Sequence, residues 1–117
     1  MGLTYARIKI TGSRGSRELK LLVDTGSLFT WIDKRVLTEV CIEPSSIKKF
    51  RTIEGKEITR RVGNTVIEIL GEKAPRIVVF GEIRDAQVVG ADSLEGLGFE
   101  VDPTTKELKR VEAFLAV

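Results

Sequence analysis

The sequence contains no histidine, and this absence excludes several familiar kinds of active site. Without imidazole, neither a Ser-His-Asp triad nor a Cys-His nucleophile can be assembled. Imidazole-based zinc sites are excluded as well, and we predict no metal and no cofactor. If the protein is an enzyme, its acid and base must come mainly from carboxylates, lysines or Tyr5.

Cysteine is almost as scarce as histidine. The single residue, Cys41, excludes an internal disulfide and any redox motif built from two cysteines. It stands between Val40 and Ile42, and we expect it to be a small buried hydrophobic residue.

Long apolar runs and strong charge of one sign are also missing. No run could span a bilayer, and the first residues lack the apolar stretch and cleavage site of a secretory signal, so we expect a cytoplasmic protein without membrane contact. The net charge is only +2, and basic pairs are scattered between apolar residues. We expect solvated strand faces there and no nucleic-acid partner. A basic nucleic-acid-binding barrel is the alternative, and it rests only on this mild charge.

The residues that are present predict one mainly β domain. The chain has 117 residues, of which 42% are apolar and 31% charged, and this fits a single globular domain over residues 1–117. Alternation of polar and apolar residues, rich in β-branched side chains, predicts strands. The expected strands are 3–11, 17–23, 29–32, 48–53, 57–62, 65–70, 76–80, 87–89, 99–102 and 107–115.

Two short helices are expected between these strands. Asp33 can cap a helix that ends near Val40. Within residues 88–98 the leucine spacing becomes helical, and Gly98 is placed to end that helix. Turns with Gly or Pro predict hairpins at residues 12–16, 54–56 and 103–106.

One stretch, LLVDTGS at residues 21–27, places an acidic side chain directly after an apolar strand. A charged group buried without a partner is costly, so the Asp24 carboxylate is either satisfied by its neighbours or present for chemistry. Taken alone, Asp24 is most simply a turn residue bonded to nearby backbone, because Asp and Gly are common in turns.

Two further segments change that interpretation. TIEGKEI at residues 52–58 is a Gly-tipped hairpin, and VVGADSL at residues 88–94 is an apolar-apolar-Gly step before a short helix. In this order, the three segments resemble those of the retropepsin-like aspartic proteases, over most of the chain from about residue 3 to about residue 102. The resemblance implies an aspartic endopeptidase with a mainly β, closed barrel-like acid-protease fold and one or two short helices.

The resemblance assigns catalytic roles to Asp24, Thr25 and Gly26. In that family, two aspartates hold the nucleophilic water as a general base and a general acid. Two carboxyls about 3 Å apart cannot both ionise, so they share a proton. This chain carries one Asp-Thr-Gly, so the resemblance implies a homodimer with its active site on the twofold axis. The Thr25 hydroxyl would bond the partner's backbone, and Gly26 would allow close approach.

The residues expected to bind an extended peptide or protein substrate are Ser27, Leu28, Ile53 and Gly55. The Ser27 hydroxyl can hydrogen-bond the ionised Asp24 carboxylate and lower its proton affinity, which predicts an acidic optimum. Gly55 is placed as the tip of a flap that closes over the peptide and excludes water. Ile58 and residues near Ile83 are further candidates for pocket walls.

The chain departs from many viral members of that family. They pair an acidic residue just after the catalytic turn with an Arg after the second Gly, whereas this chain has Phe29 and Ala91 at those places. They also dimerise through interleaved chain ends. Residues 111–117 are apolar enough for this, and a strand completing its own subunit is the alternative. Trp31 is expected in the core.

A second function stays open from the sequence. A fold does not fix a function, so the alternative is a non-proteolytic dimeric binding or assembly module that keeps the protease fold. The intact Asp-Thr-Gly-Ser favours the enzyme, because a binding module has no need of a carboxylate at that place.

Overall fold

The computed structural model describes residues 2–114 and 116, and nine strands and two helices lie within them. The strands are β1 (Tyr5–Gly12), β2 (Gly15–Val23), β3 (Thr30–Asp33), β4 (Pro44–Arg51), β5 (Glu57–Ile69), β6 (Glu72–Gly81), β7 (Val88–Val89), β8 (Phe99–Val101) and β9 (Leu108–Arg110). The helices are α1 (Lys34–Glu39) and α2 (Ala91–Leu97). The prediction of a mainly β protein with two short helices is confirmed.

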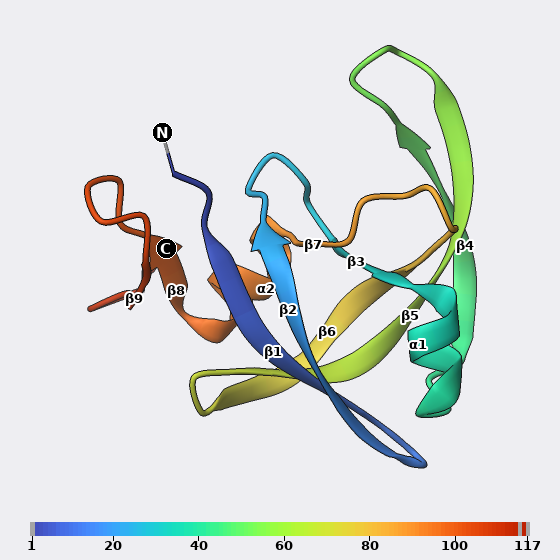
Figure 1. The fold of residues 1–117 in the computed structure, drawn as a ribbon, viewed down its shortest axis with the longest axis horizontal. Coiled ribbons are helices and arrows are strands. Elements are labelled where there is room, and N and C mark those ends of the chain that lie inside the picture. Colours follow the sequence, from blue (N-terminus) through green and yellow to red (C-terminus); the bar gives the residue numbers. More distant parts are fainter. Residues whose placement is uncertain (1, 115, 117) are drawn as a thin grey trace.

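Most of the strands close into a ring. The seven-stranded sheet has the order β1-β2-β7-β3-β6-β5-β4, and β5 also pairs with β1. Within the described residues, β4 pairs only with β5, so its other edge is open. Figure 1 shows the β4–β5 hairpin rising from one side of the ring, while β8 and β9 form a separate small hairpin on the other side.

The core is one cluster of apolar side chains that the ring and both helices share. Strand alternation supplies it: Ala6, Ile8 and Ile10 of β1 are buried, and the residues between them face outward or lie half-buried. Helix α2 adds Leu94 and Leu97. Each large aliphatic side chain buried in this way contributes about 1.5 to 3 kcal/mol, so the cluster holds the ring together.

Strand β5 is longer than predicted. The sequence predicts two strands, at residues 57–62 and 65–70, with Gly63 and Asn64 between them. The structure has one continuous strand, because Gly63 and Asn64 pair with Val78 and Ile77 of β6. Cross-strand pairing outweighs the turn preference of these two residues.

Strand β9 is shorter than predicted. The sequence predicts a strand over residues 107–115, whereas the ladder pairs only Leu108–Arg110 with Phe99–Val101. The Val111 N–H still bonds the Gly98 carbonyl at 2.8 Å, but α2 ends there and offers no further strand partner. The end of the predicted strand, Leu115, lies outside the described residues.

Helix α1 begins as the sequence predicts. The Asp33 carboxylate accepts the backbone N–H of Arg35 at 2.8 Å and the Arg35 Nη2 at 2.7 Å. These hydrogen bonds from Arg35, the side-chain one first, lower the pKa of Asp33 to about 2.

The expectation of a buried Cys41 is wrong. After α1 the chain reverses at Cys41, which has a φ of 57° and an exposed side chain. Its neighbours Val40 and Ile42 remain buried. The two apolar neighbours therefore take the inward positions, and the residue at the reversal is left outside.

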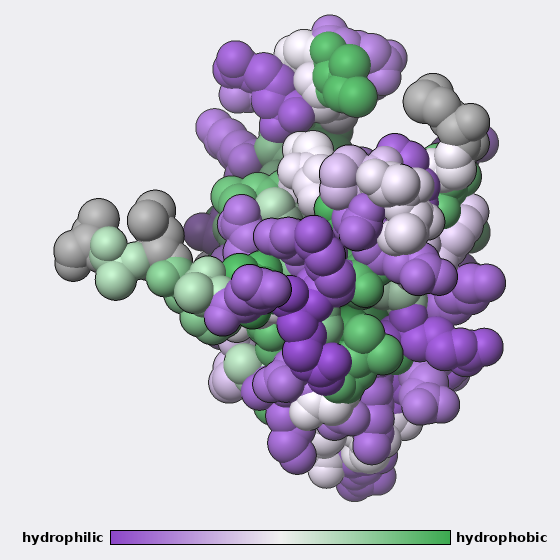
Figure 2. All heavy atoms as spheres, turned by 90° about the vertical axis from the view of Figure 1, so that its left-hand side faces the viewer, coloured by the Kyte–Doolittle hydropathy of each residue, from purple (hydrophilic) through white to green (hydrophobic). Residues whose placement is uncertain are grey.

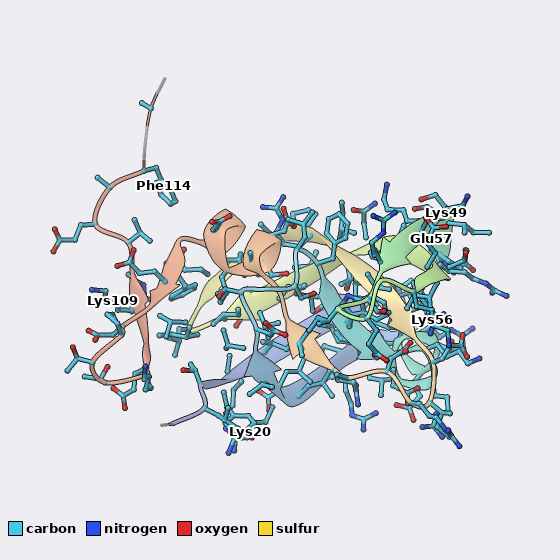
Figure 3. The ribbon with its side chains drawn as sticks, turned by 90° about the horizontal axis from the view of Figure 1, so that it is seen from above. Lys20, Lys49, Lys56, Glu57, Lys109 and Phe114 are labelled. Carbon is cyan, nitrogen blue, oxygen red and sulfur yellow. The ribbon has the colours of Figure 1, made fainter. Side chains whose placement is uncertain are left out.

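Polar side chains dominate the surface that Figure 2 shows, with apolar areas between them and one at the end of the β4–β5 hairpin at the top. Figure 3 shows Lys49, Lys56 and Glu57 at one end of the molecule and Lys109 and Phe114 at the other. Among the described residues, no helix combines the length and the apolar character needed to cross a membrane.

Candidate functional site

The acidic turn, residues 24–27, begins where β2 ends. The Ser27 N–H bonds the Asp24 carbonyl at 3.1 Å, and the Gly26 N–H bonds the Asp24 Oδ1 at 2.9 Å. Asp24 itself is exposed and forms no ion pair with the described residues. The turn thus aims the carboxylate at solvent instead of the core and leaves Oδ2 without a protein partner in the hydrogen bonds that the described residues make.

Ser27 does not make the hydrogen bond that the sequence suggests. Its hydroxyl donates to the Phe29 carbonyl at 2.9 Å and not to the Asp24 carboxylate. A short hydroxyl side chain in a turn readily bonds backbone two residues along, and Phe29 offers such an acceptor. In the single chain, the Ser27 hydroxyl therefore holds the turn and makes no hydrogen bond to the Asp24 carboxylate.

The Val-Val-Gly segment and the start of α2 brace the acidic turn. The Asp24 N–H bonds the Val89 carbonyl at 2.9 Å, and the Ala91 N–H bonds the Ser27 carbonyl at 2.8 Å. Gly90 lies so close that a Cβ there would stand 2.3 Å from the Phe29 carbonyl oxygen. Only glycine fits between these two backbones.

A buried pair of hydroxyls completes this brace. Thr30 Oγ1 accepts the Gly90 N–H at 3.1 Å and lies 2.6 Å from the Ser93 Oγ. Both side chains are fully buried. Because buried polar groups are costly when unpaired, this network fixes β3, β7 and α2 in one arrangement behind the acidic turn.

The hairpin tip, residues 52–56, forms where the sequence predicts it. The Thr52 N–H bonds the Lys56 carbonyl at 2.8 Å, and the Lys56 N–H bonds the Thr52 Oγ1 at 3.1 Å. Gly55 has a φ of 84°, which a glycine adopts without strain. Ile53 is fully exposed at this tip.

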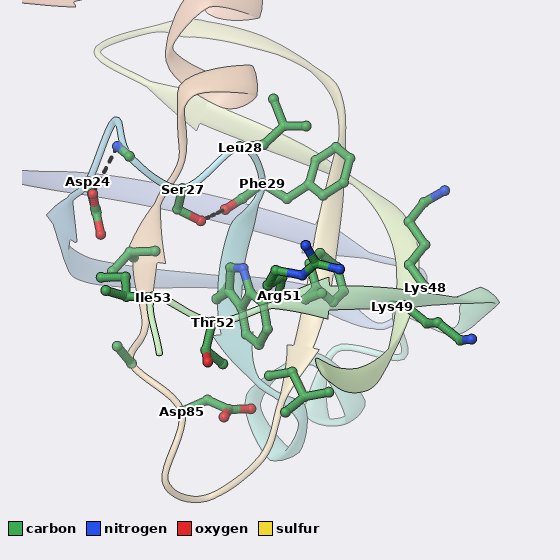
Figure 4. Close-up of a pocket in the computed structure, with 16 residues that line it drawn as sticks. Asp24, Ser27, Leu28, Phe29, Lys48, Lys49, Arg51, Thr52, Ile53 and Asp85 are labelled. Atoms are coloured by element: carbon green, nitrogen blue, oxygen red, sulfur yellow. Dashed lines mark hydrogen bonds between the residues drawn. The ribbon is translucent and has the colours of Figure 1, made fainter. Parts of the chain in front are cut away.

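One pocket of about 570 Å³ lies between the acidic turn and the β4–β5 hairpin (Figure 4). Of the residues predicted for the site, it is lined by Asp24, Gly26, Ser27, Leu28 and Ile53. The further candidate Ile58 lines it as well. Thr25, Gly55 and Ile83 do not line it; Asp85 and Ala86 stand in the segment after Ile83 that does.

The sequence reasoning missed the aromatic side of the pocket. Phe29, Trp31 and Phe50 line it and are half-buried, so the expectation of Trp31 in the core is wrong. The Phe50 ring lies edge-on to both others, with centroids 6.3 Å from Phe29 and 5.0 Å from Trp31. Strand alternation could have indicated that Phe29 and Trp31 lie outside the core. Thr30 and Ile32 are fully buried, so the side chains next to them on the strand must face the other way.

The pocket holds a second carboxylate, Asp85, which is fully engaged. Its oxygens accept Arg60 Nε at 2.7 Å and Nη2 at 2.9 Å, and the Glu82 N–H at 2.6 Å. The bond from Arg60 lowers the pKa of Asp85, and the bond to Asp85 raises the pKa of Arg60. Figure 4 shows Asp85 well apart from Asp24.

Basic side chains stand on the β4 side of the pocket. Lys48, Lys49 and Arg51 line it, and Arg51 has an exposed partner in Glu57 at 3.8 Å. Neither lysine forms an ion pair with any described residue. Residues 2–114 and 116 contain no group of three or more His, Cys, Asp or Glu that could hold a metal ion.

Comparison of the sequence with protein-family models and with curated proteins finds no match. We therefore infer the function from the geometry of the site.

Proposed function

We propose that the protein is an aspartic endopeptidase of the retropepsin-like type, active as a homodimer. The observation that carries this proposal is the exposed Asp24 carboxylate, which a backbone-braced turn holds in the wall of a peptide-sized pocket. The closed ring of strands, the Gly-tipped hairpin over the pocket and the Val-Val-Gly brace behind the turn support the same proposal.

The chemistry needs two carboxyl groups. One takes a proton from water as its oxygen attacks the peptide carbonyl carbon, and the other gives a proton to the carbonyl oxygen. When the tetrahedral intermediate collapses, the C–N bond breaks, the amine leaves with a proton from the first group, and a hydroxyl of the intermediate returns a proton to the second group. Two carboxyls in contact share a single proton, and this supplies one acid and one base in the same pH range.

The second carboxyl does not come from the same chain in this proposal. Asp85 is the other acid in the pocket, and its oxygens are occupied by Arg60 and the Glu82 N–H. A second copy of the chain would instead present its own Asp24 across a twofold axis. Thr25 is exposed beside Asp24 and does not line the pocket, so its hydroxyl is free to meet that partner.

The test is digestion of a mixed peptide library at pH 4 to 6 by the wild type, by Asp24→Asn and by Glu18→Gln. Glu18 is an exposed carboxylate on β2, the strand that leads to Asp24, and serves as the matched control. We expect Asp24→Asn to lose at least about 100-fold in rate and Glu18→Gln to match the wild type. Cleavage that survives Asp24→Asn would overturn the proposal.

Mixing the two chains tests the dimer. Where dimers form fully and exchange, adding an equal amount of Asp24→Asn to wild type reduces the rate to about half, because half of the wild-type chains pair with an inactive partner. An unchanged rate would show that each chain acts alone. A dimer that cuts nothing at any pH tested would replace the enzyme with the non-proteolytic binding or assembly module.

A further inference from the structure

The pocket has an aromatic floor, formed by Phe29, Trp31 and Phe50, and a positive rim, formed by Lys48 and Lys49. Both can select the side chains of a ligand. Phe29, Trp31 and Phe50 are half-buried and present part of their rings to the pocket. A cavity of about 570 Å³ has room for a large side chain and the peptide that carries it. Edge-to-face contact with such rings favours an aromatic side chain over an aliphatic one.

The positive charge of Lys48 and Lys49 is not balanced locally, because the Asp24 carboxylate stands on the opposite side of the pocket (Figure 4). Asp85 is neutralised by Arg60, and Glu57 faces Arg51. Lys48 and Lys49 have no acidic partner among residues 2–114 and 116. A ligand carboxylate would supply the missing charge.

The geometry of β4 decides which lysine faces the aromatic floor. Side chains alternate between the two faces of a strand, so Lys48 shares a face with Phe50, and Lys49 lies on the other face. The ladder agrees, because Phe50 pairs with Ile58 and Lys48 pairs with Arg60, whose side chain reaches the pocket residue Asp85. Figure 4 shows the Lys48 and Lys49 side chains leaving β4 in opposite directions.

The open edge of β4 can hold an extended peptide beside this face. Within the described residues β4 has no strand on that edge, and peptides commonly add themselves to such edges through backbone hydrogen bonds. An extended peptide also alternates its side chains, so residues two apart face the same way. A peptide on this edge would therefore face the pocket with side chains two residues apart, the same spacing as that of Lys48 and Phe50.

We propose that the pocket selects an extended peptide carrying an aromatic residue and, two positions away, an acidic residue. The aromatic side chain packs on Phe29, Trp31 and Phe50, and the acidic one meets Lys48. Figure 4 shows Asp24 and Lys48 on opposite sides of the pocket with Phe29 between them, so the aromatic residue lies between the bond that is cut and the acid. This specificity rests on the proposed function, since it takes the occupant to be a peptide substrate.

The test is fluorescence anisotropy with labelled, end-blocked peptides on the full-length Asp24→Asn protein, which holds a peptide without cutting it. The parent peptides contain Phe-Ala-Glu or Glu-Ala-Phe between serines and threonines. The parent peptide that binds more tightly is then varied. We expect replacing its Glu with Gln to weaken binding about twofold to fivefold at low salt, and replacing its Phe with Ala to weaken binding about tenfold or more. Moving Glu by one residue removes its advantage, because it then faces away.

Variants of the rim lysines test which of them recognises the acidic residue of the peptide. Lys48→Gln should abolish the preference for Glu over Gln, and Lys48→Glu should reverse it in favour of a Lys peptide. Lys49→Gln, at a lysine that also lines the pocket but leaves β4 on its other face, should keep more of the preference than Lys48→Gln does. Lys73→Gln, on β6 outside the pocket, should keep all of it. High salt should reduce the preference for the Glu peptide when Lys48 is unchanged, because exposed charges are screened.

The outcomes separate this proposal from the proposed function. Equal affinity for the Glu and Gln peptides, equal effects of Lys48→Gln and Lys49→Gln, or no binding of any peptide would overturn the specificity. Wild-type cleavage of library peptides at sites without this pattern would overturn it too, while supporting the protease. Selective binding without any cleavage by the wild type would support the pocket's specificity and overturn the protease.

Discussion

The two walls of the pocket are built in opposite ways. The wall of the acidic turn is held from behind by three backbone hydrogen bonds to β7 and α2, made by Asp24, Ser27 and Leu28, and by the Gly90 N–H, which donates to the Thr30 hydroxyl. Thr30 and Ser93 behind it are fully buried, and Gly90 leaves no room for a side chain. Groups fixed in this way keep their positions before any ligand arrives.

The wall of the β4–β5 hairpin has far fewer supports. The hydrogen bonds at residues 52–56 lie within the tip itself, and most of β4 is exposed. Below the tip, the hairpin is tied down by the Phe50 ring against Phe29 and Trp31 and by the Arg60–Asp85 pair. Segments with little buried contact open most easily.

This contrast is consistent with the proposed peptidase. A carboxylate that must meet its symmetry mate over a water molecule needs a fixed position, whereas the wall that admits and covers the peptide needs freedom. Hydrogen bonds to β7 and α2 support the turn of Asp24, whereas those of the hairpin tip lie within the tip itself. The comparison predicts different responses to mutation in the two walls.

The largest effect is expected from adding one methyl group to each wall. Gly90→Ala would force a Cβ to within 2.3 Å of the Phe29 carbonyl oxygen, where only backbone can give way. We expect it to lower the free energy of unfolding by about 3 kcal/mol. Gly55→Ala meets open space and costs about 1 kcal/mol for its positive φ. Urea unfolding measures both, and equal losses would contradict the contrast.

A smaller effect is expected at the ion pair under the hairpin. The Arg60 and Asp85 side chains are 18% and 16% exposed, and Asp85→Asn should lower the free energy of unfolding at pH 7 by about 1 to 2 kcal/mol. Folding lowers the pKa of Asp85, so the pair stabilises above the unfolded value of about 3.9 and is lost as pH falls through the folded value.

The pH dependence of that difference is therefore diagnostic. Wild type and Asp85→Asn should differ in urea unfolding at pH 7 and converge in acid. The control, Glu57→Gln, breaks a 3.8 Å pair whose side chains are 73% and 61% exposed, and it should change stability by less than about 0.5 kcal/mol at any pH. A difference for Asp85→Asn that persists at pH 2 would show that the carboxylate charge is not the cause.

The smallest stability effect is expected at the hairpin tip, with a functional effect in its place. Ile53 is fully exposed, so Ile53→Ser should leave the free energy of unfolding within about 0.5 kcal/mol. Because Ile53 lines the pocket, we expect KM for peptide cleavage to rise about threefold to tenfold. Ile47→Ser, also exposed but outside the pocket, is the control and should leave KM unchanged.

The positions of most elements could be predicted from local patterns. Alternation gave the β1–β2 hairpin, Asp33 gave the start of α1, and Gly98 gave the end of α2. The errors lie where a partner decides the outcome. Gly63 and Asn64 have turn preferences but pair with β6, and β9 stops because β8 has no more backbone to offer.

The candidate site divides in the same way. The acidic turn and the hairpin tip are local motifs, and the sequence placed both correctly. The aromatic floor was missed because Phe29, Trp31 and Phe50 come from segments that meet only in the folded chain. The hydrogen bond of Ser27 was misassigned, because two acceptors lie close to it and only the folded turn selects between them.

The sequence by itself determined the type of secondary structure and limited the possible chemistry. Without histidine, any acid–base catalysis would have to come mainly from carboxylates, lysines or Tyr5, and one carboxylate follows an apolar strand at a turn. Tertiary structure alone decided that Asp24 is exposed in a pocket wall, that Asp85 forms an ion pair with Arg60, and that Lys48 lines the same pocket as three aromatic rings. The physical reason is that propensity acts between neighbours in the chain, whereas burial, pairing and charge balance act between residues brought together by folding.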